Sequence, residues 1–267
     1  MTSSTPDALW SAPSLRLLRP AGIAWRDLRH GRLLDGCSLT VPVGARLLVV
    51  GQPEAGASLL LRVLAGLSPV RHGRVEIAGT ADPSPLGWAR RVGYVGPETG
   101  IRSWMTPREA LRLAADLLEL SSSATARRIE EVGEWVRLPA SALDRPVGRG
   151  GPGLAQRTAL AAALLGDPEV LLLDEPLRAI DPDERRRLLR VPGRRRTVLL
   201  ASRYPAGEEG LAGHVALLRD GRIALLAPMR QLEAAGLPLS MHGIVTLADL
   251  RAAAPESRPA PAAVAPR

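Results

Sequence analysis

The chain has 267 residues, of which 46% are hydrophobic, with a mean hydropathy of +0.03 and a formal net charge of +8. This length is enough to bury the core of a complete α/β domain, and the composition excludes an intrinsically disordered chain. The apolar runs at 59–67 and 170–173 are too short to span a bilayer, so a membrane-spanning protein is not expected.

The two ends and the cysteine content indicate where the protein works. Residues 1–20 contain no apolar core followed by a cleavage site, so we expect no signal peptide. The single Cys37 excludes an internal disulfide and fits a cytoplasmic protein. Residues 1–19 are predicted to be a flexible N-terminal segment, and 251–267, rich in Ala and Pro, a disordered tail.

All of the 35 basic residues are arginines. One explanation is a GC-rich coding sequence, which favours Ala, Arg, Gly and Pro. The other is attraction to nucleic acid or to an anionic membrane surface. The scatter of the arginines along the chain favours the first. The clusters at 185–187 and 194–196 are exceptions, and we predict that they belong to a solvated helix face.

Strands are predicted first at 38–41 and 45–50, the second of them an apolar run typical of a buried parallel strand. A glycine-containing turn, 51–56, then leads into a helix that extends to Leu67. The later strands are predicted at 74–77, 92–95, 170–173, 197–201, 215–218 and 222–226, and the later helices at 106–120, 124–136 and from about 153 to 165. Strand–turn–helix units of this kind predict a mainly parallel sheet with right-handed crossovers.

Two acids, Asp174 and Glu175, follow the apolar strand at 170–173. Carboxylates at the end of a buried strand are costly unless they have a function there. Mg²⁺ takes oxygen ligands, so the first acid is a candidate metal ligand and the second a candidate group for polarising water. The alternative is a pair of exposed turn acids. The length of the surrounding run from Gly166 to Pro176, followed by Asp181, makes a chance match to a metal-binding motif of this kind improbable.

This run resembles the Walker B motif of ABC-type ATP-binding subunits, and the resemblance extends over about 20–230 in the right order. Asp174 takes the metal-binding position, Glu175 the catalytic-base position, and Asp181 the D-loop position. The segments 92–95, 105–109 and 213–223 match further parts of the family pattern. The resemblance implies a P-loop NTPase (RecA-like) fold at 20–250, with an antiparallel β subdomain and an α-helical subdomain inserted at about 98–150.

The resemblance also implies ligands and partners. ATP is expected at Gly51, Gly56, Ala57, Ser58 and Leu59, and Mg²⁺ at Ser58 and Asp174. The expected partners are an integral membrane permease and a second ATPase subunit, in a homodimer or heterodimer. The expected location is the inner face of the cell membrane.

The phosphate loop departs from the pattern G-x-x-x-x-G-K-[ST], in which the lysine contacts the β/γ-phosphates. Ala57 replaces that lysine, and Glu54 adds a negative charge nearby. A charge contact at about 4 Å, with an effective dielectric near 20, contributes roughly 4 kcal/mol, or about three decades of affinity. Arg62 lies one helical turn further on, where a solvent-facing side chain is the expectation.

Other switch positions differ as well. Pro97 replaces the Q-loop glutamine, and Arg203 the switch histidine. The signature motif LSGGQ aligns with 150–154. Gly151 stands at the serine position and has no hydroxyl, Pro152 stands at the first glycine position and has no N–H, and Gly153 matches the second glycine. His30 is the candidate for stacking on adenine.

Three functions remain open on these residues. The first is an ATP-binding subunit with weak nucleotide binding and slow or absent hydrolysis. The second is a non-catalytic pseudo-ATPase that acts as a structural or regulatory interaction module. The third is a protein that acts on nucleic acid or ribosomes, suggested only by the charge. The retained acids fit either residual Mg²⁺-nucleotide binding or recent decay of an active copy.

Overall fold

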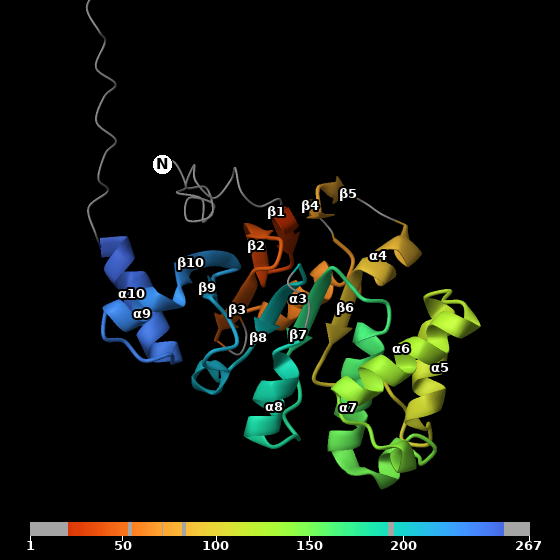
Figure 1. The fold of residues 1–267 in the computed structure, drawn as a ribbon. Coiled ribbons are helices and arrows are strands. Elements are labelled where there is room, and N and C mark those ends of the chain that lie inside the picture. The colour runs from red at the N-terminus through yellow and green to blue at the C-terminus, as the bar shows by residue number, and fades with distance from the viewer. Residues whose placement is uncertain (1–20, 53–54, 71, 82–83, 192–194, 254–267) are drawn as a thin grey trace, which may run out of the picture.

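The computed structural model describes residues 21–52, 55–70, 72–81, 84–191 and 195–253. Its strands form two sheets, and its helices gather mainly on one face and at the two ends of the larger sheet (Figure 1). The strands are β1 (Ala21–His30), β2 (Leu34–Pro42), β3 (Arg46–Gly51), β4 (His72–Ile77), β5 (Thr80–Ala81), β6 (Val92–Val95), β7 (Val170–Asp174), β8 (Thr197–Ala201), β9 (His214–Arg219) and β10 (Arg222–Pro228). The helices are α3 (Ala57–Leu64), α4 (Pro85–Arg91), α5 (Pro107–Leu117), α6 (Ser122–Trp135), α7 (Gly151–Leu164), α8 (Pro182–Leu189), α9 (Met229–Ala234) and α10 (Met241–Ala253).

The larger sheet has the strand order β10-β9-β3-β8-β7-β6. All neighbouring pairs from β9 to β6 are parallel, and only β10 runs antiparallel to its neighbour. The smaller sheet, β2-β1-β4-β5, is entirely antiparallel. The predicted mainly parallel sheet and antiparallel β subdomain are therefore confirmed.

Two hydrophobic cores lie on opposite faces of the larger sheet, because successive side chains of a strand point to opposite faces. In β3, Leu47 and Val49 belong to the core shared with α3 and the antiparallel sheet. Leu48 and Val50 belong to the core shared with the helices of the other face. Strand β7 is buried over its whole length, so its apolar run is explained by packing on both sides.

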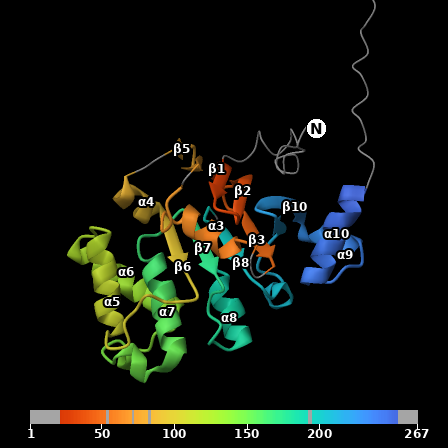
Figure 2. The same ribbon diagram turned by 180° about the vertical axis from the view of Figure 1, so that it is seen from behind.

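Helices α5, α6 and α7 form a layer at one end of the molecule, and α9 and α10 lie at the other end (Figures 1 and 2). Helices α5 and α6 both fall inside 98–150, where the helical insertion is expected. Thr106 caps α5 through a capping box with Glu109, which explains why the helix begins there. None of the described helices has the length and apolar character needed to cross a membrane.

Strand β1 and the end of α10 differ from the sequence-based expectation. The prediction begins the strands at 38, whereas β1 begins at Ala21; its pairing with β2 is interrupted by register shifts, which break the alternation that identifies a strand. Helix α10 continues to Ala253, so 251–253 are helical and not part of a disordered tail. The rest of the expected tail and the expected N-terminal segment lie outside the described residues.

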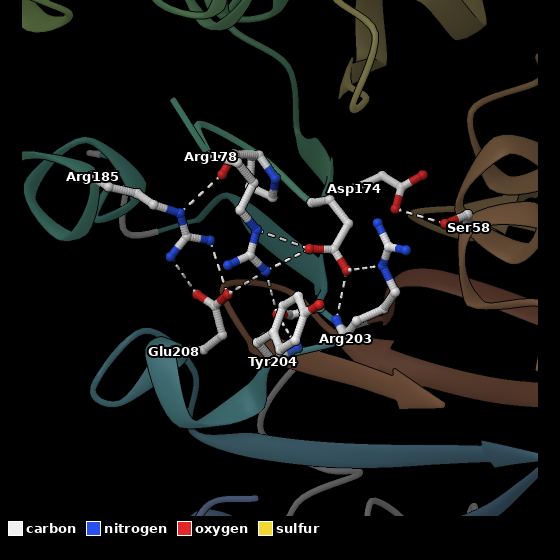
Figure 3. A network of polar contacts seen from close by, with 10 residues as sticks. Ser58, Asp174, Arg178, Arg185, Arg203, Tyr204 and Glu208 are labelled. Atoms are coloured by element: carbon white, nitrogen blue, oxygen red, sulfur yellow. Dashed lines mark hydrogen bonds and ion pairs between the residues drawn. The ribbon is translucent and has the colours of Figure 1, made fainter. Parts of the chain in front are cut away.

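The arginine cluster at 185–187 is not the solvated face that the sequence predicts. Arg185 is buried, and its guanidinium donates to both carboxylate oxygens of Glu208, at 2.8 and 2.9 Å, and to the carbonyl of Pro176 at 2.9 Å (Figure 3). Glu208 is also fully buried. The bidentate geometry satisfies a pair of charges whose burial is otherwise costly.

Breaking this buried pair should destabilise the fold strongly. We expect Glu208→Gln to lower the free energy of unfolding by about 3–5 kcal/mol, because Arg185 would keep its charge without a carboxylate partner. Chemical denaturation measures the change. The matched control is Glu209→Gln at the exposed neighbouring position, expected to stay within about 0.5 kcal/mol. Equal stability of the two variants would contradict the assignment.

Candidate functional site

The candidate site lies at the carboxyl end of β7, beside the amino terminus of α3. A cavity of about 590 Å³ opens there. Its wall includes Leu33, Gly51, Gly56, Ala57, Ser58, Leu59, Arg62, Asp174, Glu175 and Arg203. The structure thus brings together Gly51, Gly56, Ala57, Ser58, Leu59 and Asp174, the residues expected to bind ATP and Mg²⁺, with the candidate base Glu175. Glu54 lies outside the described residues.

The turn before α3 depends on Gly56. This residue has φ 87°, and a Cβ at this position would lie 2.6 Å from the carbonyl oxygen of Leu33. Only glycine fits both constraints. The main-chain N–H of Leu60 donates to the carbonyl of Gly56, so the N–H groups of the three preceding helical residues have no partner within the helix. Those three residues, 57–59, line the cavity. Such a helix end attracts anions, phosphate included.

Asp174 is buried and is contacted by two neutral hydroxyls. Ser58 Oγ donates to Oδ1 at 2.9 Å, and the Tyr94 hydroxyl donates to Oδ2 at 3.2 Å. Burial raises the pKa of Asp174 above its usual value, and the two hydrogen bonds act in the opposite direction. Burial also raises the pKa of Tyr94, the nearby Asp174 charge adds to this rise, and the positive charge of Arg62 opposes it.

The Ser58 hydroxyl and the Asp174 carboxylate fit a magnesium ion. Both are oxygen ligands of the kind that Mg²⁺ prefers, and their short separation allows one ion to contact both. Bound there with nucleotide, the ion would neutralise phosphate charge. Among the described residues no group of three or more His, Cys, Asp and Glu side chains is placed to hold a metal, so the phosphates and water would complete the coordination.

Glu175 has a different environment from Asp174. Its Oε2 accepts from Nε of Arg178 at 2.9 Å and also from the Nη2 of the same guanidinium. Its Oε1 accepts from the main-chain N–H of Arg203 at 2.6 Å and lies 3.3 Å from Nε of that residue. A carboxylate offers about four lone-pair sites. Each carboxylate oxygen of Glu175 therefore accepts from two donors.

Arg178 joins this carboxylate to the buried pair described above (Figure 3). Its guanidinium donates to Ser202 Oγ at 2.7 Å, lies 3.3 Å from a carboxylate oxygen of Glu208, and stacks over the Tyr204 ring at 5.6 Å. Glu175 is thus one end of a continuous polar network that runs into the core through Arg178, Glu208 and Arg185.

The remaining predicted positions lie away from this cavity. The described residues that line it include neither Pro97 nor Asp181. Pro97 is exposed, and Asp181 caps the amino terminus of α8. Gly151, Pro152 and Gly153 begin α7, and this end of the helix contacts the D-loop: Gln156 Oε1 accepts from the Ala179 N–H at 2.9 Å.

His30, the sequence-based candidate for stacking on adenine, is not among the described residues that line the candidate cavity. A second cavity of about 530 Å³ shares Leu33 and Gln52 with the first and is also lined by Arg32, Met241 and Val245. The described residues that line this second cavity do not include His30 either.

Sequence reasoning did not find Tyr94 or Arg178, although weak signals existed. Tyr94 lies on β6, whose parallel pairing with β7 places it opposite Leu172. Arg178 follows Glu175 by three residues. Arg62, expected to face solvent, is exposed but lines the cavity wall.

The raised pKa of Asp174 predicts a pH-dependent stability. The folded state holds its proton to higher pH than the unfolded state, so this group favours folding at low pH, and the advantage is lost as pH rises through the folded pKa. We expect Asp174→Asn to raise the free energy of unfolding at pH 7, by up to about 2 kcal/mol, and to flatten this part of the pH profile. Denaturation between pH 4 and 8 measures both. A less stable Asp174→Asn at pH 7 would contradict the burial penalty.

Comparisons with known proteins agree with this geometry. Residues 34–178 match the family model described as ABC transporter. An ABC transporter ATP-binding protein of Nostoc sp. is 32% identical over 239 residues, covering 86% of this chain and 69% of its own length. The aliphatic sulfonates import ATP-binding protein of Bacillus licheniformis is 34% identical and covers 74% of this chain and 77% of its own length. The Nod factor export ATP-binding protein I of Burkholderia pseudomallei is 32% identical, with coverages of 76% and 68%.

Two solved structures have the same fold. The ATP-binding subunit of an ABC transporter superposes with a TM-score of 0.73 at 23% identity, covering 85% of this chain and 99% of that one. A dimeric ATP-binding cassette bound to ADP and phosphate superposes with a TM-score of 0.69 at 18% identity, with coverages of 78% and 99%. The motif order, the cavity at the end of β7 and these similarities together establish that the chain belongs to the ABC transporter family of ATP-binding proteins.

Proposed function

We propose that the chain is the ATP-binding subunit of an ABC transporter, that it binds Mg-ATP, and that it hydrolyses ATP slowly or not at all. The observation that carries the proposal is the contrast between the two acids of the site. Among the described residues, the side-chain hydrogen bonds to Asp174 come from two neutral hydroxyls, whereas Glu175 is bound by two arginines. Family membership supports the first part of the proposal.

Nucleotide binding is supported by the features that remain at the end of α3. The glycine turn is kept, the N–H groups of the helix end face the cavity, and the Ser58–Asp174 pair offers oxygen ligands. The missing lysine weakens such a site because Ala57 contributes no charge. Weak Mg-ATP binding is therefore the expected state.

Impaired hydrolysis follows from the surroundings of Glu175. A general base must lie within hydrogen-bond reach of the attacking water and have a site to accept its proton. Here Arg178 and Arg203 already donate to both carboxylate oxygens of Glu175.

The proposed partners are a membrane permease and a second ATPase subunit, which would place the chain on the inner face of the cell membrane. An open groove of about 460 Å³ between α5, α7 and β6 supports permease docking. Leu67 and Leu117 line it and are 56% and 68% exposed. Large exposed apolar side chains in one groove are typical of an interaction surface. The similar proteins include an import and an export protein, so the permease would determine substrate and direction.

Calorimetric titration with Mg-ATP tests nucleotide binding directly. We expect binding tighter than about 1 mM, which corresponds to roughly 4 kcal/mol, and we expect Asp174→Asn to abolish it because a metal ligand is lost. If no heat and no thermal shift appear at saturating nucleotide, the chain is instead a pseudo-ATPase retained for its protein contacts.

Restoring the phosphate-loop lysine separates binding from turnover. We expect Ala57→Lys to tighten Mg-ATP binding by up to about three decades, the magnitude of one charge contact at about 4 Å. Steady-state hydrolysis should stay slow, because Glu175 keeps its arginine partners. Ala57→Met, with similar length and no charge, is the matched control. Turnover by Ala57→Lys alone at an ordinary enzymatic rate, about 1 s⁻¹ or faster, would refute the role given to these arginines.

A further inference from the structure

Arg62 lines the candidate nucleotide cavity without a described partner of its own. It is exposed, and among the described residues no hydrogen bond or ion pair engages its guanidinium. The other arginine of the described cavity wall, Arg203, differs because it forms an ion pair with Glu175. Arg62 is therefore the cavity arginine whose charge is not already matched by a described carboxylate.

The position of Arg62 on α3 directs its side chain toward the site. It follows Ser58 by four residues, so the two side chains lie on the same face of the helix, one above the other. Helical side chains lean toward the amino terminus of their helix, which here is the end that faces the cavity. An arginine side chain is long enough to extend along one turn in this direction.

We infer that Arg62 supplies the positive charge to the nucleotide phosphates that Ala57 cannot supply, from one turn further along α3. This inference rests on the proposed nucleotide binding. A guanidinium presents several donors in a planar fork that matches phosphate oxygens. The phosphates would then be held between the helix N–H groups and Arg62, with the metal on the Ser58–Asp174 side.

The test compares Mg-ATP affinities by calorimetry for the full chain and for Arg62→Ala, Arg62→Lys and Arg145→Ala. Arg145 is the matched control because it is exposed, forms no side-chain hydrogen bond or ion pair with the described residues and lies outside the cavity wall. We expect Arg62→Ala to weaken binding at least about tenfold, the loss of one hydrogen bond to a charged group. Arg62→Lys should bind between Arg62→Ala and the unchanged chain, and Arg145→Ala should match the unchanged chain.

A second titrant, Mg-tripolyphosphate, has the phosphates without the nucleoside. The same loss with tripolyphosphate would assign Arg62 to the phosphates. Thermal melting should be unchanged in Arg62→Ala, since the side chain is exposed. If the unchanged chain binds Mg-ATP and Arg62→Ala binds it equally well, the role of Arg62 is wrong and the proposed function stands. If the unchanged chain binds neither titrant, both are wrong.

Discussion

Strand β7 determines most of what this site can do. Its leucines are buried on both faces of the sheet, which fixes the point at which Asp174 and Glu175 emerge. Parallel neighbours β6 and β8 then supply the groups around those acids, because their carboxyl ends reach the same edge. Tyr94 comes from β6, and the segment after β8 supplies Ser202 and Arg203. The geometry of the two carboxylates is thus a consequence of strand packing, and the loops only complete it.

The absence of lysine changes the electrostatics of this site in a specific way. Arginine donors are arranged in a rigid fork that binds both oxygens of a carboxylate, whereas lysine acts as a compact point charge. Arg185 binds both oxygens of Glu208 in this way, whereas Arg178 links one oxygen of Glu175 to one oxygen of Glu208, and these four residues form a network that continues from the core to the cavity. Positive charge near Glu175 is therefore held by fixed ion pairs, while the phosphate loop, which needs charge, has Ala57.

Sequence patterns predicted the parts of the fold that depend on uninterrupted periodicity. Strands β6 and β8 have the predicted bounds because their apolar runs end sharply. Strand β1 was missed because its register shifts disturb alternation. The residues of the candidate site were likewise predicted only in part. The motif spacing placed Gly56, Ser58 and Asp174 together, but Arg185 was wrongly assigned to solvent because its partner Glu208 is distant in sequence. Contacts such as Tyr94–Asp174 depend on which strands pair, and one sequence does not reveal that order.

The two adjacent acids of one motif have different surroundings. Neutral hydroxyl donors leave Asp174 its negative charge for a cation, and its burial makes that charge costly until a cation arrives. Cationic donors already satisfy Glu175, so it has no comparable need for a ligand. Adjacent residues at the end of β7 would therefore have opposite energetic relations to a magnesium nucleotide. Under the function we propose, this asymmetry would favour occupancy over turnover, because the groups that would hold the metal ion are separate from the one that would activate water.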